Sequence, residues 1–112
     1  MGTTGESAEA MLQRAQDLLA DDDGPKGQKR FFELVSKAAE LGLAEAMMEL
    51  GGCYQEGTGV KRDPKLAFTW MERAAEAGSE GARLHLGHFH ELGIGTKQDL
   101  AKAEEVMRRG KK

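Results

Sequence analysis

The chain has 112 residues, the size of a single domain with a modest hydrophobic core. Its formal net charge of −3 argues against a general nucleic-acid binder, because such proteins carry a basic face. A single cysteine excludes an internal disulfide framework, and no apolar run is long enough for a signal peptide or a membrane span, so we expect a cytoplasmic protein with neither nucleic-acid nor membrane partners.

The first predicted helix follows a polar tail at residues 1–5. Ser7 can cap this helix, which runs to about Ala20. Its apolar residues share one face and are Ala8, Met11, Leu12, Ala15, Leu18 and Leu19. The opposite side is acidic and rich in glutamine, which is typical of the terminal cap of a stacked array.

Residues 21–27, DDDGPKG, resemble a calcium loop only superficially. If Gly24 stood at loop position 6, positions 1 and 12 would be Leu19 and Arg30, where calcium requires carboxylates. We therefore predict a solvated loop at 21–27.

A second helix is predicted from about Gln28 to Leu41. Its expected buried residues are Phe31, Phe32, Leu34, Val35, Ala38 and Ala39. The two helices together form a divergent helical hairpin over residues 6–43.

Another helical hairpin is predicted over residues 44–79. Its first helix has an apolar face made of Leu43, Ala46, Met47, Leu50 and Tyr54. Gly57 and Gly59 end this helix, because glycine adopts positive φ without strain. Asp63 and Pro64 then begin the second helix as its cap and first residue. The inward residues of that helix are expected to be Leu66, Ala67, Trp70, Met71, Ala74 and Ala75.

Much of this hairpin recurs 36 residues later. The recurring residues are Ala46, Leu50, Gly51, Gly57, Gly59, Asp63 and Ala67, which return as Ala82, Leu86, Gly87, Gly93, Gly95, Asp99 and Ala103. A fixed period of this length indicates a solenoid, whose units bury their apolar faces by stacking. The sequence thus predicts an all-α solenoid of three antiparallel helical hairpins, with residues 1–112 forming one repeat domain. The third hairpin spans residues 80–112 and is truncated at its C-terminus.

The repeated pattern also resembles a known family. Residues Ala46 to Gly78 read A-x-x-x-L-G-x-x-Y-x-x-G-x-G-V and then D-x-x-x-A-x-x-W-x-x-x-A-A-x-x-G, which resembles the Sel-1-like repeat, a relative of the tetratricopeptide repeat. The next unit departs from it at His90, Thr96 and Val106, and the segment before Ala44 matches only in its second helix. The resemblance implies a right-handed superhelix, no cofactor, and a non-enzymatic scaffold or adaptor that presents a concave groove to a partner protein or peptide.

In such solenoids the first helix of each pair lines the concave side. The stripe opposite the apolar face contains Glu45, Met48, Glu49, Gly52 and Glu56, followed one unit later by Gly81, Leu84, His85, His88 and Leu92. We expect partner binding at Glu45, Met48, Glu49, Gly52, Glu56, Leu84, His85 and His88. The glutamates favour basic segments, and Gly52 and Gly81 leave floor space for a ligand backbone. The alternative is that these positions are merely solvated.

A metal site is another interpretation of the same stripe. His85 and His88 lie one helical turn apart and can share a metal ion, and Glu49 precedes His85 by one repeat length. This pattern would suit a small metal-binding protein or an enzyme.

A self-assembling structural module is the third interpretation. Residues 1–24 carry a net charge of −5, whereas residues 96–112 carry +3. Because the last helix is short, Val106 and Met107 are expected to be partly uncovered. Weak head-to-tail self-association would join these unlike ends.

Overall fold

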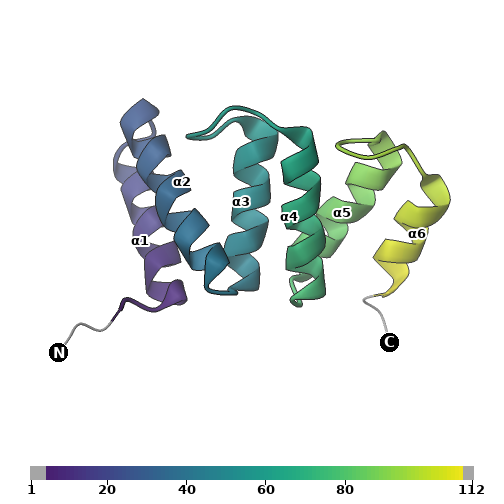
Figure 1. Cartoon of the computed structure of the whole chain (residues 1–112), viewed down its shortest axis with the longest axis horizontal. Helices are drawn as coiled ribbons and strands as arrows, with labels where there is room; N and C mark the ends of the chain where they lie inside the picture. Colours follow the sequence, from purple (N-terminus) through teal and green to yellow (C-terminus); the bar gives the residue numbers. More distant parts are fainter. Residues whose placement is uncertain (1–4, 110–112) are drawn as a thin grey trace.

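The computed structural model describes residues 5–109, which form six α-helices and no β-strand. The helices are α1 (Ala8–Asp21), α2 (Pro25–Glu40), α3 (Ala44–Glu56), α4 (Pro64–Glu76), α5 (Glu80–Leu92) and α6 (Leu100–Arg109). They stand side by side along a body of 49 × 31 × 19 Å, with α1 and α6 at opposite ends of the stack (Figure 1). The prediction of an all-α solenoid of helical hairpins is confirmed. The expected tail at 1–4 and the basic end at 110–112 lie outside the described residues.

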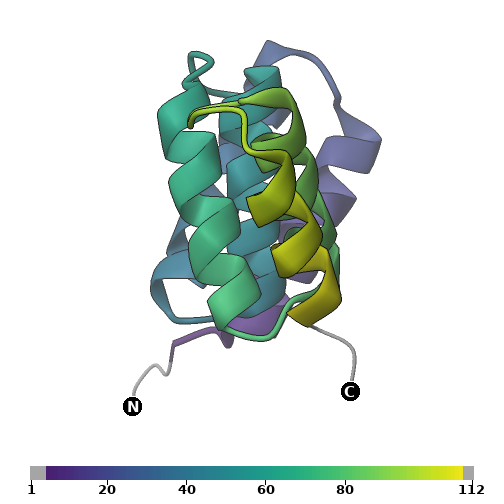
Figure 2. The same cartoon turned by 90° about the vertical axis from the view of Figure 1, so that its right-hand side faces the viewer.

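The helices form two layers. Each helix packs against the next one in sequence, and α3 also contacts α5. In Figure 1, α2, α4 and α6 lie nearer the viewer than α1, α3 and α5. Figure 2, seen along the stack from its C-terminal end, shows that the helix axes are roughly aligned. We call α1, α3 and α5 the A helices and α2, α4 and α6 the B helices.

Small residues allow the A and B helices of one unit to approach closely. A Cβ atom on Gly51 of α3 would lie 3.1 Å from the side chain of Met71 on α4, and one on Gly87 of α5 would lie 2.5 Å from Met107 on α6. Both pairs are related by the 36-residue period. Each glycine therefore forms a notch that a methionine fills. The repeat-related alanines in the core are Ala38 and Ala74, Ala46 and Ala82, and Ala67 and Ala103.

Two residues of α4 are less buried than the sequence predicts. Leu66 is 39 % exposed, and Trp70 is half-buried rather than buried. The face of α4 that packs on its neighbours runs through Ala67 and Met71, so Leu66 and Trp70 lie together on its flank, four residues apart. The guanidinium of Arg73 covers the outer side of the Trp70 ring, 4.3 Å from its centroid.

The loop of the first unit is shorter than predicted. It contains only residues 22–24, because α2 begins at Pro25 rather than near Gln28. Proline suits the first turn of a helix, where its missing N–H group has no partner to lose. Gly27 is also helical, and a Cβ there would lie 1.5 Å from the carbonyl oxygen of Asp22. Glycine is therefore required at position 27 because the backbone of Asp22 lies close to it, and not because position 27 belongs to a loop.

The loops of the second and third units join each unit to the one before it. Gly59 has a left-handed backbone with φ of 72°, and a Cβ there would lie 2.2 Å from the carbonyl oxygen of Gln28 on α2. Gly95 repeats this arrangement, with a φ of 70° and a distance of 2.1 Å to the carbonyl oxygen of Pro64 on α4. Each loop thus rests on the start of the preceding B helix.

Candidate functional site

The exposed sides of the A helices form one candidate surface, which we call the A-helix face. Helix α3 buries Ala46, Met47, Leu50 and Cys53, so residues on its opposite side remain accessible to a partner. The A-helix face consists of Glu9, Gln13 and Gln16 of α1, Glu45, Met48, Glu49, Gly52 and Glu56 of α3, and Gly81, Leu84, His85 and His88 of α5.

Helix α3 gives this surface its negative charge. It carries Glu45, Glu49 and Glu56 and contains neither lysine nor arginine. Glu45 and Glu56 are exposed, whereas Glu49 is half-buried. Burial raises the pKa of the Glu49 carboxyl above its ordinary value, and the neighbouring charge of Glu45 raises that pKa further. An incompletely solvated carboxylate therefore lies near the middle of an acidic stripe.

Met48 and Gly81 meet where α3 passes α5. A Cβ on Gly81 would lie 2.8 Å from Sδ of Met48, and the Ser79 hydroxyl donates to the same sulfur atom at 3.7 Å. Met48 therefore fills the space above Gly81. The prediction that Gly81 leaves space for a ligand backbone is wrong. Gly52 does leave space, since beyond its chain neighbours and the adjacent backbone of α3 no described residue has an atom within 4 Å of the position of its Cβ.

Helix α5 contributes Leu84, which is 49 % exposed, together with the exposed His85 and His88. Nδ1 of His88 lies 3.2 Å from Oε1 of Glu91, one turn along the same helix. Within residues 5–109, no three His, Cys, Asp or Glu side chains are placed to share a metal ion. The structure therefore does not bring His85, His88 and Glu49 together as a ligand set.

The sequence analysis missed the part of this surface that comes from α1. Glu9, Gln13 and Gln16 line a hollow of about 190 Å³ together with Glu45 of α3. The signal was present in the sequence, because these three residues precede Glu45, Glu49 and Gly52 by one repeat length. The prediction of a terminal cap at α1 does not include this surface.

Cys53 lies beneath this surface and is 2 % exposed. Its burial raises the pKa of the thiol to about 12, and Glu49 adds to the shift. Because the thiolate is the nucleophilic form, Cys53 is a packing residue rather than a reactive group. In the part of the chain that the structure describes, every helix is too short or too polar to cross a bilayer.

The C-terminal end of the stack is better covered than the sequence predicts. Val106 is only 5 % exposed, and Met107 is half-buried against Gly87. Arg83 of α5 explains part of this, because it donates to the carbonyl oxygens of Val106 and Met107 in the last turn of α6. The expected uncovered Val106 is therefore wrong.

The chain is similar to known proteins in both sequence and structure. The model of the Sel1 repeat matches three times, over residues 8–43, 44–79 and 81–105. The chain belongs to the Sel1 repeat family. The match at 8–43 also shows that the first hairpin is similar to the family in both of its helices, not only in the second. Sel1 repeats are generally protein-interaction modules.

Solved structures agree with this assignment. A Sel1 repeat protein from Oxalobacter formigenes is 35% identical with a TM-score of 0.77, and the match covers 88% of this chain and 74% of that one. The protective antigen c5321 of uropathogenic Escherichia coli, which displays an SLR fold, is 28% identical with a TM-score of 0.82; the match covers 88% of this chain but only 21% of the antigen. Cysteine rich protein B of Helicobacter pylori is 20% identical with a TM-score of 0.71, covers 95% of this chain and 90% of its own, and shows the fold alone. No curated protein matches the chain.

Proposed function

We propose that the chain is a non-enzymatic adaptor that binds a lysine- or arginine-bearing segment of a partner protein on its A-helix face. The observation that carries this proposal is the acidic stripe of α3, where Glu45, Glu49 and Glu56 face the same way on a helix without a basic residue. Membership of a family of interaction modules supports a partner-binding role.

Glu49 would be the central contact of this interaction. Its pKa is raised because burial has removed part of the water that would solvate its charge. A lysine or arginine of a partner would restore a favourable environment for the carboxylate through a charge-assisted hydrogen bond, which is stronger where water is partly excluded. Glu45 and Glu56 are exposed, so they would mainly attract the partner during its approach.

Apolar contacts beside the charges would supply the rest of the interface. Leu84 is exposed on α5, and Met48, at the same repeat position on α3, is half-buried. Methionine adapts its shape to different partners. Gly52 leaves room for a peptide backbone to approach α3. The partner segment would therefore combine basic residues with at least one apolar residue.

Selection from a phage-displayed random peptide library against the full chain tests the proposal. Enriched peptides should be rich in lysine or arginine, and calorimetry should show that the double variant Glu45→Lys with Glu49→Lys no longer binds them. The matched control reverses charges on the B helices, through Lys29→Glu with Lys65→Glu, both exposed. Arg73 is not a suitable control, because it stacks on Trp70. Peptides without basic enrichment, or binding lost only in the control variant, would reject the proposal.

A further inference from the structure

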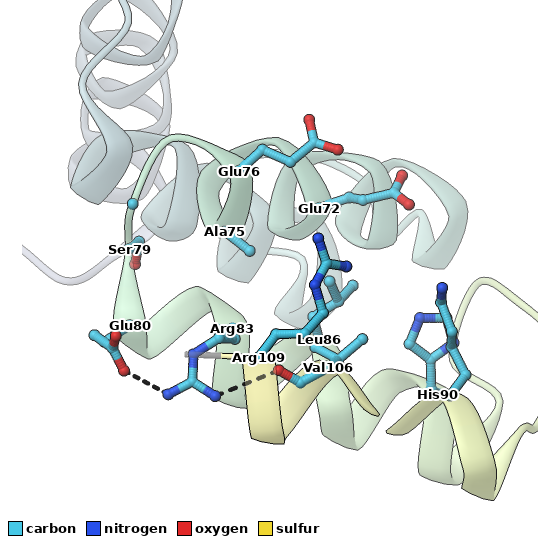
Figure 3. A pocket seen from close by; sticks show the side chains of 12 residues that line it. Glu72, Ala75, Glu76, Ser79, Glu80, Arg83, Leu86, His90, Val106 and Arg109 are labelled. Atoms are coloured by element: carbon cyan, nitrogen blue, oxygen red, sulfur yellow. Dashed lines mark hydrogen bonds and ion pairs between the residues drawn. The ribbon is translucent and has the colours of Figure 1, made fainter. Parts of the chain in front are cut away.

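A second cavity lies away from the A-helix face, where α4, α5 and α6 meet (Figure 3). It has a volume of about 430 Å³, within the range of small-ligand sites. Ala75 of α4, Leu86 of α5 and Val106 of α6 give it an apolar lining. Among the described residues that line it, none belongs to the A-helix face.

The repeat explains why this cavity exists. Val106 stands at the position that Trp70 occupies one unit earlier. The Trp70 side chain is partly buried and packs against the hydrophobic core of the stack. A valine at the same position lacks the volume of an indole ring. The cavity therefore lies beside a position at which the third unit lacks the aromatic ring of the second.

Polar residues replace two further large side chains around the cavity. Arg83 stands where the second unit has the buried Met47, and His90 stands where it has Tyr54. His90 is 7 % exposed, and its Nδ1 has no hydrogen-bond partner within residues 5–109. Nε of Arg83 is likewise buried without a partner in that range. Both nitrogens have almost no accessible surface, so they lie within the wall of the cavity, which Arg83 and His90 make more polar than its counterpart in the second unit.

The second unit also shows how an aromatic ring would be held. The guanidinium of Arg73 lies 4.3 Å from the centroid of the Trp70 ring, a cation–π contact. Arg109 has the same position relative to Val106 that Arg73 has relative to Trp70. Arg109 lines the cavity, and in Figure 3 its side chain points from α6 toward α4. The third unit thus has the arginine of this pair without the ring.

The charges around the rim define what should flank the ring. Glu72 and Glu76 of α4 form one side, and Lys102 and Arg109 of α6 form the other. We infer that the cavity binds a tryptophan or tyrosine side chain of a partner polypeptide, with a basic residue of that segment toward α4 and an acidic residue toward α6. This second site goes beyond the proposed function and is independent of it.

The test uses the full chain labelled with ¹⁵N and a capped Gly-Lys-Trp-Glu-Gly peptide. Titration should produce saturable amide shifts confined to α4, α5 and α6. A matched peptide with leucine in place of tryptophan should produce far smaller shifts. N-acetyl-tryptophanamide, which has the ring without the flanking charges, should bind more weakly than the peptide. If it binds equally well, the cavity is a site for a free aromatic molecule and the inferred polypeptide ligand is wrong.

Three variants complete the test. Val106→Trp should fill the cavity and abolish binding of the peptide. Arg109→Gln changes only an exposed side chain, so it should leave the fold intact and weaken binding by about two- to fivefold through loss of the cation–π contact. The variant Glu45→Lys with Glu49→Lys should bind the tryptophan peptide as the parent chain does, even if it has lost the basic peptides. Absence of saturable shifts, shifts that map to α3, or full affinity in both Val106→Trp and Arg109→Gln would overturn the inference.

Discussion

The rings of Phe68 and His90 pack edge to face across the boundary between the second and third units, with their centroids 5.3 Å apart. Phe32 and Tyr54 make the same contact one boundary earlier, at 5.6 Å. The two pairs are related by the 36-residue period, so histidine takes the structural place of tyrosine. It keeps the ring contact but leaves a buried nitrogen without a partner in the described part of the chain.

This relationship predicts that His90→Phe stabilises the chain. Phenylalanine keeps an aromatic edge against Phe68 and removes the unpaired Nδ1, whose burial is unfavourable. The gain in the free energy of unfolding should be about 1 kcal/mol, measured by urea denaturation. The control is Tyr54→Phe at the equivalent, less buried position, which should change stability little. A clear loss of stability in His90→Phe would mean that His90 has a polar partner in the folded chain.

The loop glycines make a second prediction possible. Gly42 and Gly59 both have positive φ, but apart from its two chain neighbours no described residue has an atom within 4 Å of a Cβ at Gly42. Gly42→Ala should therefore cost only the left-handed backbone strain, about 1–2 kcal/mol. Gly59→Ala adds a collision with the backbone carbonyl of Gln28, so its melting temperature should fall much further. Equal losses in thermal melts followed by circular dichroism would show that the loop does not rest on α2.

Glu49 predicts a pH-dependent effect on stability. Its pKa is raised in the folded chain, mainly by burial, so the folded state holds this proton more tightly than the unfolded state does. Stability therefore falls as pH rises through the raised pKa, and ionised Glu49 is unfavourable at pH 7. Glu49→Gln should raise the melting temperature at pH 7.

This advantage of Glu49→Gln should shrink as the pH is lowered through the raised pKa of Glu49. It should disappear below the pKa of glutamate in the unfolded chain, because the carboxyl is then neutral in both states. The comparison variant is Glu33→Gln, on the exposed side of α2. A gain that does not change with pH would assign the effect to packing instead of charge.

Cys53 predicts slow thiol chemistry in the folded state. Burial raises the pKa of its thiol to about 12, so almost no thiolate is present at pH 8. A disulfide reagent such as 5,5′-dithiobis(2-nitrobenzoate) should react slowly with the folded chain and rapidly after unfolding in urea. The rate should rise in Gly59→Ala, because destabilised chains open more often. Rapid, stoichiometric labelling of the folded parent chain would contradict the buried position.

Most of the fold follows from local patterns that the sequence displays openly. Asp63 accepts a hydrogen bond from the backbone N–H of Leu66, and Pro64 begins α4, as their positions predicted. Gly57 and Gly59 adopt positive φ, also as predicted. These features depend on a few neighbouring residues, so a single sequence is enough to place them.

The errors concern packing between elements. A helical wheel assigns Leu66 to the inward face of α4, but it does not show how wide the contact with the neighbouring helices is. Gly27 resembles a loop residue until the backbone of Asp22 is known to lie against it. The cavity beside Val106 depends on the missing volume of a ring between three helices. The hydrophobic periodicity of a single helix does not predict the volume left between neighbouring helices.

The contact between Gly59 and Gln28, repeated between Gly95 and Pro64, has a consequence for engineering the length of the stack. Residues 44–79 contain both sides of this contact. The loop at Gly59 packs on the preceding unit, and the loop of the following unit packs on Pro64. A second copy of residues 44–79, inserted after residue 79, would make the same backbone contacts with its two neighbouring units that the original segment makes. The segment is therefore a cassette, and chains with one or two additional copies should fold as longer rods without redesign of any junction.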